Sequence, residues 1–383
     1  MAIAVAGCGP AGLAAALLLH RDGHEVTLFE RFEAPQPLGS GLMLQPTGLA
    51  ALAALGLDRA VLARGARIER LTGEAGGRVV LSVAYAALRG ERFGLGIHRA
   101  ALFDTLHRAT VDAGIAIRTG CAVQAIEQAG TRQRLICADG SAGSFDLIVD
   151  ALGARSPLVP PGRPLAYGAL WTAVPWTQGF DSSALQQRYC RASVMAGVLP
   201  IGEGRAAFFW SLRADRLDAW RRDGLATWKT EVETLWPATR QLLEAIHSPE
   251  QMTFARYAHR THPAPAGAGV VHIGDAWHST SPQLGQGANM ALLDAHALAL
   301  ALRTSDSLEA ALARMVALRR RHVWLYQAMS RLLTPVYQSD GRVVPFARDR
   351  LVGPLSRVRL VQRIQAAMVT GLVGDPLGPL GLR

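Results

Sequence analysis

The sequence predicts an α/β fold in three parts: a domain built on a parallel sheet, an antiparallel layer inserted into it, and a helical C-terminal tail. Three observations predict this. A glycine-rich turn at residues 7–12 separates an apolar run from an Ala/Leu-rich run. Alternating, aromatic-bearing segments fill residues 165–257. A second Ala/Leu-rich run at 288–302 follows another glycine-rich turn, and prolines and arginines recur after residue 335.

The first unit of the chain has the pattern strand, turn, helix, strand. Residues 3–6 are apolar, residues 13–21 have helical character, and residues 25–30 are β-branched and apolar and end on an acid. Together they predict a βαβ unit at the N-terminus.

The remaining elements follow from the same periodicities. Helices are predicted at 48–62, 99–113, 288–302 and 357–372, and strands at 79–85, 134–137, 145–149 and 270–273. The alternating stretch 165–257 predicts an antiparallel sheet that forms a separate, substrate-binding layer.

Composition and charge limit the function. At 383 residues and 50% hydrophobic content the chain can bury a large core, which favours two interlocked domains. The net charge of +10 favours anionic ligands, and Lys229, the single lysine, is expected to be a solvated surface residue, which makes Schiff-base chemistry implausible. Arginines gather toward the C-terminus without interleaved aromatic residues, so nucleic-acid binding is not expected. A solvated helical face is favoured, and peripheral contact with an anionic membrane is the alternative.

The four cysteines show no spacing typical of a metal site. We expect reduced thiols, no metal and a cytoplasmic protein. The apolar start lacks the basic leader of a signal sequence, and no run has the length of a membrane span.

The glycine turn carries the first chemical signal. In the motif, Gly7 permits a tight turn, Gly9 lets the backbone approach a pyrophosphate and Gly12 allows close helix packing, while the helix that starts at Pro10 and Ala11 offers N–H groups to an anion. Glu30 ends the next strand at the position that binds ribose hydroxyls in dinucleotide sites. The pattern predicts a Rossmann-type site.

A second glycine-rich turn follows the strand at 270–273. Asp275 could accept hydrogen bonds from a polyol chain, and Gly285 and Gly287 would let the main chain approach a planar ring. A plain helix N-terminus with Asp275 as a local cap is the alternative.

These motifs together resemble the class A flavoprotein monooxygenases, the para-hydroxybenzoate hydroxylase-like aromatic hydroxylases. The resemblance rests on the first glycine motif with Glu30 and Arg31, on Arg99 at the head of a helix, on the Gly274-Asp275 pair and on the run 282–289. It implies that FAD is bound by the following residues: Gly7, Gly9, Pro10, Ala11, Gly12, Glu30, Arg31, Arg99, Asp275, Pro282, Gly285, Gly287, Ala288 and Asn289. Pro282 and Gly285 would lie near the flavin ring.

The resemblance also implies the reaction. In the family, flavin reduced by NADH or NADPH reacts with O2, and the resulting hydroperoxide transfers oxygen to an aromatic, phenolic or quinone-like substrate. Where the family has Gly-Ala-Asp-Gly, this sequence has Leu152 in place of the aspartate, and Asp150 lies two positions earlier. The alternatives are an FAD-dependent dehydrogenase or reductase on the same fold, or a noncatalytic flavin-binding module. A halogenase is not expected because the motif lysine and the second tryptophan of that family are absent.

No general base is evident. Aromatic side chains of the alternating stretch could line the base of a substrate pocket: Trp210, Tyr189 and Tyr257. Packing in the core is the ordinary role of such side chains. Arg213 ends an apolar strand and could contact a substrate carboxylate or phenolate, with a surface role as the alternative. The histidines between 259 and 278 are not spaced as metal ligands.

The predicted domain boundaries follow from the changes in pattern. Residues 1–75, 98–164 and 265–335 would form the FAD-binding domain. Residues 76–97 and 165–264 would form the substrate domain, and residues 336–383 the helical C-terminal tail. The oligomeric state is left open.

Overall fold

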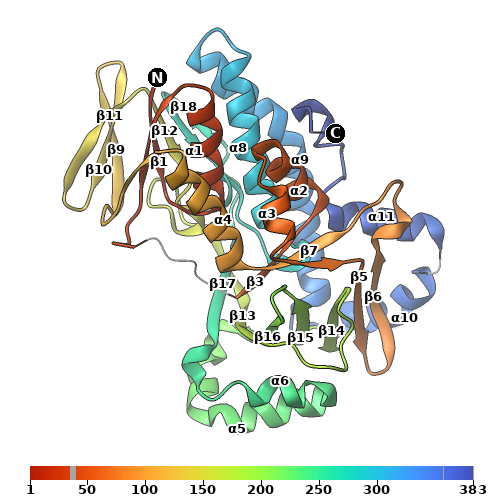
Figure 1. Cartoon of the computed structure of the whole chain (residues 1–383). Helices are drawn as coiled ribbons and strands as arrows, with labels where there is room; N and C mark the ends of the chain where they lie inside the picture. Colours follow the sequence, from red (N-terminus) through yellow and green to blue (C-terminus); the bar gives the residue numbers. More distant parts are fainter. Residues whose placement is uncertain (35–39, 357, 383) are drawn as a thin grey trace.

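The computed structural model describes residues 1–34, 40–356 and 358–382. Figure 1 shows two main layers, with a parallel sheet and its helices above an inserted sheet that helices α5 and α6 cover from below. The C-terminal helices lie along one side of both layers.

The parallel sheet has the strand order β18-β19-β12-β1-β2-β8. All neighbours pair in parallel except β18, which runs antiparallel to β19. Their bounds are β1 (Ala2–Ala6), β2 (Glu25–Phe29), β8 (Ala116–Arg118), β12 (Leu147–Asp150), β18 (Ala266–Gly267) and β19 (Val270–His272). β12 pairs with β1 although its residues are more than 140 positions away, so this sheet is discontinuous in sequence.

Helices α1 (Pro10–Arg21), α4 (Arg99–Asp112) and α8 (Gly287–Arg303) pack beside one another on this sheet. Their apolar side chains form a continuous buried core with the strands. The helix predicted at 48–62 is divided into α2 (Pro46–Leu55) and α3 (Asp58–Leu62), because Gly56 ends α2 in the left-handed conformation with φ 75°.

A small antiparallel sheet of β9 (Val123–Ala129), β10 (Arg132–Cys137) and β11 (Gly140–Phe145) projects beside the parallel sheet. Two of the four cysteines form a disulfide beside this small sheet: Cys121 and Cys137, whose Cα atoms are 5.5 Å apart. The prediction of reduced thiols is therefore wrong for these two residues, since the pairing of β9 with β10 brings together cysteines that are 16 positions apart in sequence. Cys8 and Cys190 are free. Cys121, Cys137 and Asp139 are the one group of possible metal ligands among the described residues, and the disulfide uses both thiols.

The inserted sheet has the order β17-β13-β16-β15-β14-β5-β6. Its strands are β5 (Arg70–Ala75), β6 (Arg78–Ala84), β13 (Arg163–Pro175), β14 (Ala184–Cys190), β15 (Val194–Pro200), β16 (Arg205–Arg213) and β17 (Thr253–His259). Neighbours pair antiparallel except β14 and β5. A short sheet of β3 (Gly41–Leu44), β7 (Gly94–His98) and β4 (Ala66–Ile68) links the two layers.

The two faces of the inserted sheet carry different side chains, as the alternation along each strand requires. On β16, Phe208 and Trp210 point to the outer face, where they pack with Trp228. Ala207 and Phe209 point to the inner face, toward the C-terminal helices.

Helices α5 (Leu217–Leu235) and α6 (Arg240–Glu244) cover that outer face and were not predicted. α5 is broken at Gly224, which has φ 81° and ψ 167°; Trp220 before the break and Trp228 and Val232 after it are buried. The aromatic content of this stretch favours strands locally, but burial of a helical face against the sheet determines the structure.

The chain ends in α9 (Leu308–Tyr337), α10 (Val343–Leu355) and α11 (Arg359–Thr370), which confirms the predicted helical tail and, with the two sheets, the predicted fold class. Short helix α7 (Asp275–His278) lies between β19 and α8. No helix in the described ranges is long and apolar enough to span a membrane. The domain boundaries stay a prediction, although the pairing of β5 with β14 favours a first boundary before Arg70.

Candidate active site

The first glycine motif forms a tight turn between β1 and α1. Gly7 has φ 104°, and a Cβ there would lie 2.6 Å from the carbonyl oxygen of Ala151. A Cβ on Gly12 would lie 1.9 Å from the carbonyl oxygen of Gly7. At Gly9 the surroundings are open, since no protein atom lies within 4 Å of the Cβ position. The turn is packed where the helix meets the strand and accessible where a pyrophosphate would approach, so its shape fits a dinucleotide.

The N-terminus of α1 adds donors to this turn. Gly9 caps the helix without a side-chain hydrogen bond, and Pro10 occupies the first helical position, where no backbone N–H is needed. Ala11 and Gly12 are buried directly behind it. The first N–H groups of a helix attract anions, so this end suits phosphate.

Glu30 follows β2 and lies against the glycine turn. Its carboxylate accepts hydrogen bonds from the backbone N–H groups of Cys8, at 3.0 Å, and Phe32, at 3.3 Å. Burial, reinforced by the Glu30 charge, raises the pKa of the Cys8 thiol to about 12, so that thiol stays neutral. Arg31 is exposed, with its guanidinium 4.5 Å from the Phe32 ring centroid. The carboxylate is thus fixed in place with lone pairs left for ribose hydroxyls.

We expect Glu30→Gln to weaken FAD binding, because the amide loses charge and presents a donor where the backbone already donates. The expected loss is about 1.5 kcal/mol, the lower range for hydrogen bonds to charged groups, or roughly tenfold in Kd. Titration of apoprotein with FAD measures it. Glu33→Gln, at an exposed position three residues on, is the matched control. Equal Kd values for the two variants would contradict this role of Glu30.

The second motif places Asp275 beside the first. Gly274 has φ 58° and ψ −137° and caps α7. Asp275 is exposed, yet the surrounding protein desolvates its carboxyl enough to raise its pKa, against the opposing charges of His278, Arg99 and Arg260. The Asp275 carboxyl is therefore accessible and able to accept hydrogen bonds from the hydroxyl groups of a polyol.

The run 282–289 forms a one-turn helix, Pro282–Leu284, followed by α8. Gly285 has φ 61°, and the nearest atom to its Cβ position is Gln45 Nε2 at 3.8 Å. Gly287 is similarly open, with Asp275 Oδ1 at 3.9 Å from its Cβ position. Pro282 and Ala288 are partly exposed. The Cβ positions of Gly285 and Gly287 are thus uncrowded, and the contact of this run with a flat ring stays a prediction.

Asn289 has a different position from its neighbours. It is fully buried, and its Oδ1 accepts from the N–H of Gln45 at 2.7 Å while its Nδ2 donates to the carbonyls of Met43 and Gly285. Its side chain therefore links α8 to the end of β3. Any effect of Asn289 on the cofactor would then come through the backbone of residues 43–45 and 285, which its hydrogen bonds hold in place.

Arg99, at the start of α4, links the cofactor motifs to the inserted sheet. It is exposed, and its charge partly offsets the rise that burial causes in the pKa of both Asp275 and Tyr257. Burial dominates at Tyr257 and raises its pKa to about 12. The Tyr257 hydroxyl accepts a hydrogen bond of 2.9 Å from Trp171 Nε1. Through Tyr257, which lies near Arg99, the hydrogen-bonded pair of Trp171 and Tyr257 connects the aromatic side chains of the inserted sheet to the cofactor motifs.

A buried charge network beneath the second motif was not predicted. Asp294, on α8, accepts hydrogen bonds from the Gly274 N–H at 2.9 Å and from Arg319 Nε at 2.8 Å, and pairs with His278 Nε2 at 2.6 Å. Arg319 also contacts His322, whose Nε2 donates to the Gly371 carbonyl at 2.9 Å. All these side chains are buried. A lone carboxylate within an Ala/Leu-rich helix was the one sequence signal for this network.

The network makes stability depend on pH. Burial lowers the pKa of His322 well below its ordinary 6.5, so the folded chain keeps this histidine neutral while the unfolded chain protonates it. The free energy of unfolding should therefore fall as pH drops below about 6.5, by up to about 1.4 kcal/mol per pH unit for one group. Chemical denaturation at several pH values measures this slope, and His322→Gln should make it shallower. An unchanged slope would contradict the assignment.

Asp150 and the substituted position Leu152 form part of the protein framework. The Asp150 carboxylate is fully buried and binds His272 Nδ1 at 2.8 Å, the Ser156 hydroxyl at 2.7 Å and the Leu152 N–H at 3.0 Å. The Leu152 side chain packs on the apolar cluster that includes Phe29. Asp150 thus stabilises the turn after β12 through buried hydrogen bonds to Leu152, Ser156 and His272.

Two arginines have positions that sequence reasoning did not resolve. Arg213 is half-buried and forms ion pairs with Asp215 and Asp340, so its charge is already matched, and its role as a substrate contact stays a prediction. Arg260 was missed. It is buried and donates to the Ala154 carbonyl, and burial lowers its pKa against the opposing charges of Asp150 and Asp275. Trp210 faces away from the site, toward α5.

Comparison with known proteins decides which cofactor this geometry serves. The model of the FAD binding domain family matches residues 1–325. The chain belongs to this FAD binding domain family. The match confirms the predicted cofactor and the predicted resemblance.

The relatives and the solved structures of this family agree. The chain is 27% identical over 381 residues to aurachin C monooxygenase/isomerase of Stigmatella aurantiaca, covering 95% of this chain and 96% of the relative. It is 27% identical to an FAD-dependent urate hydroxylase of Klebsiella pneumoniae, covering 82% and 85%. The structure of Klebsiella pneumoniae HpxO with FAD and uric acid shares the fold at a TM-score of 0.83 and 20% identity, covering 98% of both chains. The prediction of a flavin-dependent monooxygenase is supported by these relatives.

Proposed function

We propose that this flavoprotein hydroxylates a flat, largely apolar aromatic molecule, phenolic or quinone-like, with O2 and with NADH or NADPH as reductant. The observation that carries the proposal is the apolar inner face of the inserted sheet, which reaches the cofactor motifs through Met43. Met43, on β3 of the short linking sheet, packs in the same buried cluster as that face, and its carbonyl accepts the hydrogen bond from Asn289.

The inner face has the chemistry of an aromatic-binding surface. The Trp171 and Phe209 rings are tilted by 35° with their centroids 4.6 Å apart, and Tyr189, Met195 and Leu199 are buried in the same cluster. The cluster that forms it consists of apolar side chains, and the buried Arg348 guanidinium lies over its Tyr189 and Tyr337 rings. A neutral aromatic ring can bury its area there without leaving a charge unpaired.

Bound FAD would supply the redox chemistry: it accepts a hydride from NAD(P)H and activates O2. The protein's residues hold and shield it. The glycine turn and Glu30 would hold the adenosine half, and the backbone at 285–287 would approach the ring. Trp171 and Phe209 would orient the substrate and exclude water.

Tyr257 has a defined protonation state in this scheme. Because burial raises its pKa to about 12, the hydroxyl remains protonated at neutral pH. It can donate a hydrogen bond to a substrate oxygen, but it cannot act as a general base unless it is first deprotonated. We therefore expect substrates that are electron-rich without help from a protein base.

We also propose a cytoplasmic location, which rests on the need for NAD(P)H. Substrate, O2 and the nicotinamide are the partners that the reaction requires.

The function is tested by NAD(P)H oxidation with a panel of phenols, quinones and quinolones, combined with mass spectrometry of the products. We expect at least one aromatic compound to accelerate NAD(P)H oxidation and to gain one oxygen atom. Trp171→Leu should lower this substrate-dependent rate, while FAD binding is retained. If oxidation of NAD(P)H never depends on an aromatic compound, a dehydrogenase or a noncatalytic flavin protein becomes the better description.

A further inference from the structure

The C-terminal helices expose an unusual amount of apolar side chain. Of the thirteen large hydrophobic residues exposed in the described chain, eight lie between residues 343 and 364, on α10, α11 and their connection. The main contributors, which we call the C-terminal apolar face, are Val343, Phe346, Leu351, Leu355, Leu360 and Ile364. Such a concentration marks an interaction surface, since exposed apolar residues are normally scattered.

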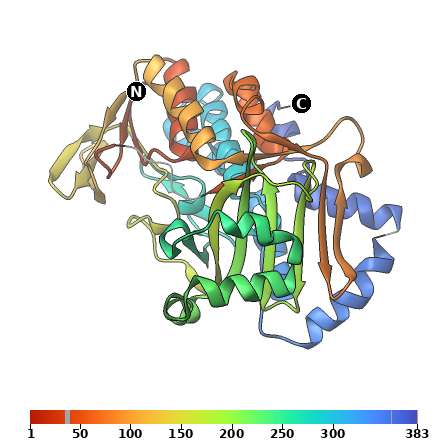
Figure 2. The ribbon, with the colours of Figure 1, turned by 60° about the horizontal axis from the view of Figure 1, so that its bottom comes forward.

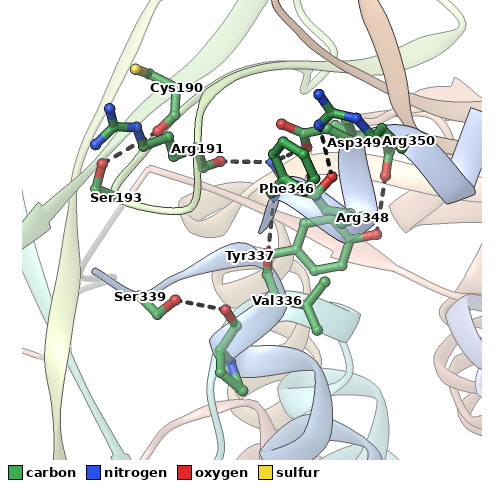
Figure 3. A network of polar contacts seen from close by, with 12 residues as sticks. Cys190, Arg191, Ser193, Val336, Tyr337, Ser339, Phe346, Arg348, Asp349 and Arg350 are labelled. Carbon is green, nitrogen blue, oxygen red and sulfur yellow. Dashed lines mark hydrogen bonds and ion pairs between the residues drawn. The ribbon is translucent and has the colours of Figure 1, made fainter. Parts of the chain in front are cut away.

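This exposure belongs to helices that are anchored. Figure 3 shows Arg348 of α10 reaching back to the protein body, where its guanidinium donates to the carbonyls of Arg191 and Val336 at 2.7 and 3.0 Å. It also lies over the rings of Tyr189 and Tyr337, and it is 4% exposed. On α11, Ala366 and Val369 are buried in the inner-face cluster. The buried sides of both helices are thus fixed, and the opposite sides face solvent at the edge beyond β5 and β6 (Figures 1 and 2).

The charge of the segment 342–370 is almost entirely positive. Residues 342–370 contain six arginines and a single acid, Asp349. That acid is paired with the buried Arg348, so the exposed arginines at 342, 350, 359 and 363 are not neutralised by acids of the same segment. A second copy of the chain would bring like charges together. An anionic surface complements them.

Arginine and apolar side chains are also combined locally. The Arg350 guanidinium lies 3.3 Å from the centroid of the Phe346 ring and donates to the Phe346 carbonyl (Figure 3). On α11, Leu360 and Ile364 are exposed one turn apart, beside Arg359 and Arg363, which have the same spacing. Helices that lie in a bilayer surface have this composition: apolar residues enter the acyl boundary and arginines meet lipid phosphates.

We propose that the C-terminal apolar face docks on an anionic lipid bilayer and holds the enzyme at its surface. Because α11 packs on the inner face of the inserted sheet, docking would place the substrate layer next to the bilayer. The proposal depends on this surface alone and is independent of the reaction.

The test is flotation of the FAD-loaded protein with vesicles of phosphatidylcholine alone or mixed with phosphatidylglycerol. We expect binding to the mixed vesicles and little binding to phosphatidylcholine. Salt at about 1 M, where the Debye length is about 3 Å, should release most of the protein. Arg359→Gln with Arg363→Gln should weaken binding by about twentyfold, since each basic residue near the surface contributes about fivefold. Leu360→Ser with Ile364→Ser should weaken it by about tenfold or more.

Matched controls come from α4. Val111→Ser and Arg108→Gln remove an exposed apolar and an exposed basic side chain elsewhere, and both should bind vesicles like the unchanged protein. Thermal unfolding checks that every variant is folded.

Two results would overturn the proposal. One is binding that is absent, or equal for the two vesicle types and for all variants. The other is a dimer, seen by light scattering without lipid, that Leu360→Ser with Ile364→Ser dissociates, because the face would then be a contact between copies.

Discussion

Gly12→Ala is expected to destabilise the protein by about 3 kcal/mol or more, at the upper end of the cost of overpacking, and to abolish retention of FAD. The added methyl group would lie 1.9 Å from the carbonyl oxygen of Gly7, so the turn and α1 must separate. Thermal unfolding of the apoprotein and the FAD content of the purified protein measure the two effects.

Gly9→Ala separates cofactor contact from folding. Its methyl group meets no protein atom within 4 Å, and the residue has φ −72°, which alanine adopts readily. The apoprotein should therefore unfold like the unchanged protein while FAD affinity falls. Gly267→Ala is the matched control, because that glycine is also open and lies in β18, away from the motif. If Gly9→Ala binds FAD normally, the pyrophosphate does not lie at this turn.

Asp294→Asn is expected to lower the free energy of unfolding by about 3–5 kcal/mol, the usual cost of breaking a buried ion pair. The Arg319 guanidinium would remain fully buried without a counter-charge, and the single amide oxygen could serve either Arg319 or the donors Gly274 and His278, but not both sets. Chemical denaturation measures the effect, and Asp218→Asn, at a highly exposed ion pair, should have almost none.

The pH dependence of the unfolding free energy tests whether Asp294 is ionised beside Arg319 and His278. His278 and Arg319 lower the pKa of Asp294 to about 2 against the opposing effect of burial, so its contribution is present above its ordinary pKa of 3.8. That contribution should disappear as pH falls from 3.8 toward 2, and the stability difference between the variant and the unchanged protein should shrink in this range. A difference that stays constant would contradict an ionised Asp294.

The parts of the site that were predictable are those in which neighbouring residues fix the backbone. Gly7, Gly9 and Gly12 lie in one turn, in which Gly12 packs on Gly7 and Gly9 stays open; the crowding at Gly7 itself comes from the distant Ala151. The run 282–289 is likewise local, and its glycines are open as expected. Such signals survive because local backbone geometry depends little on distant contacts.

The parts that were missed depend on pairing over long distances. Asp294 meets Arg319 only because α8 and α9 pack together, and no periodicity reports this. Cys121 and Cys137 meet through the register of β9 and β10. Arg213 was predicted to contact the substrate or to lie at the surface, but Asp340, which follows α9, forms an ion pair with it in the fold. Helix α5 was missed because tertiary burial overrides the strand preference of its tryptophans.

The most direct test of the proposed function is hydroxylation under isotopically labelled O2, started by mixing the FAD-loaded protein with NAD(P)H and an aromatic compound that stimulates its oxidation. We expect the product to contain one labelled oxygen atom from O2 and none from labelled water. Label entering from water, or NAD(P)H oxidation in which O2 is consumed and no product forms with any aromatic compound, would contradict a monooxygenase.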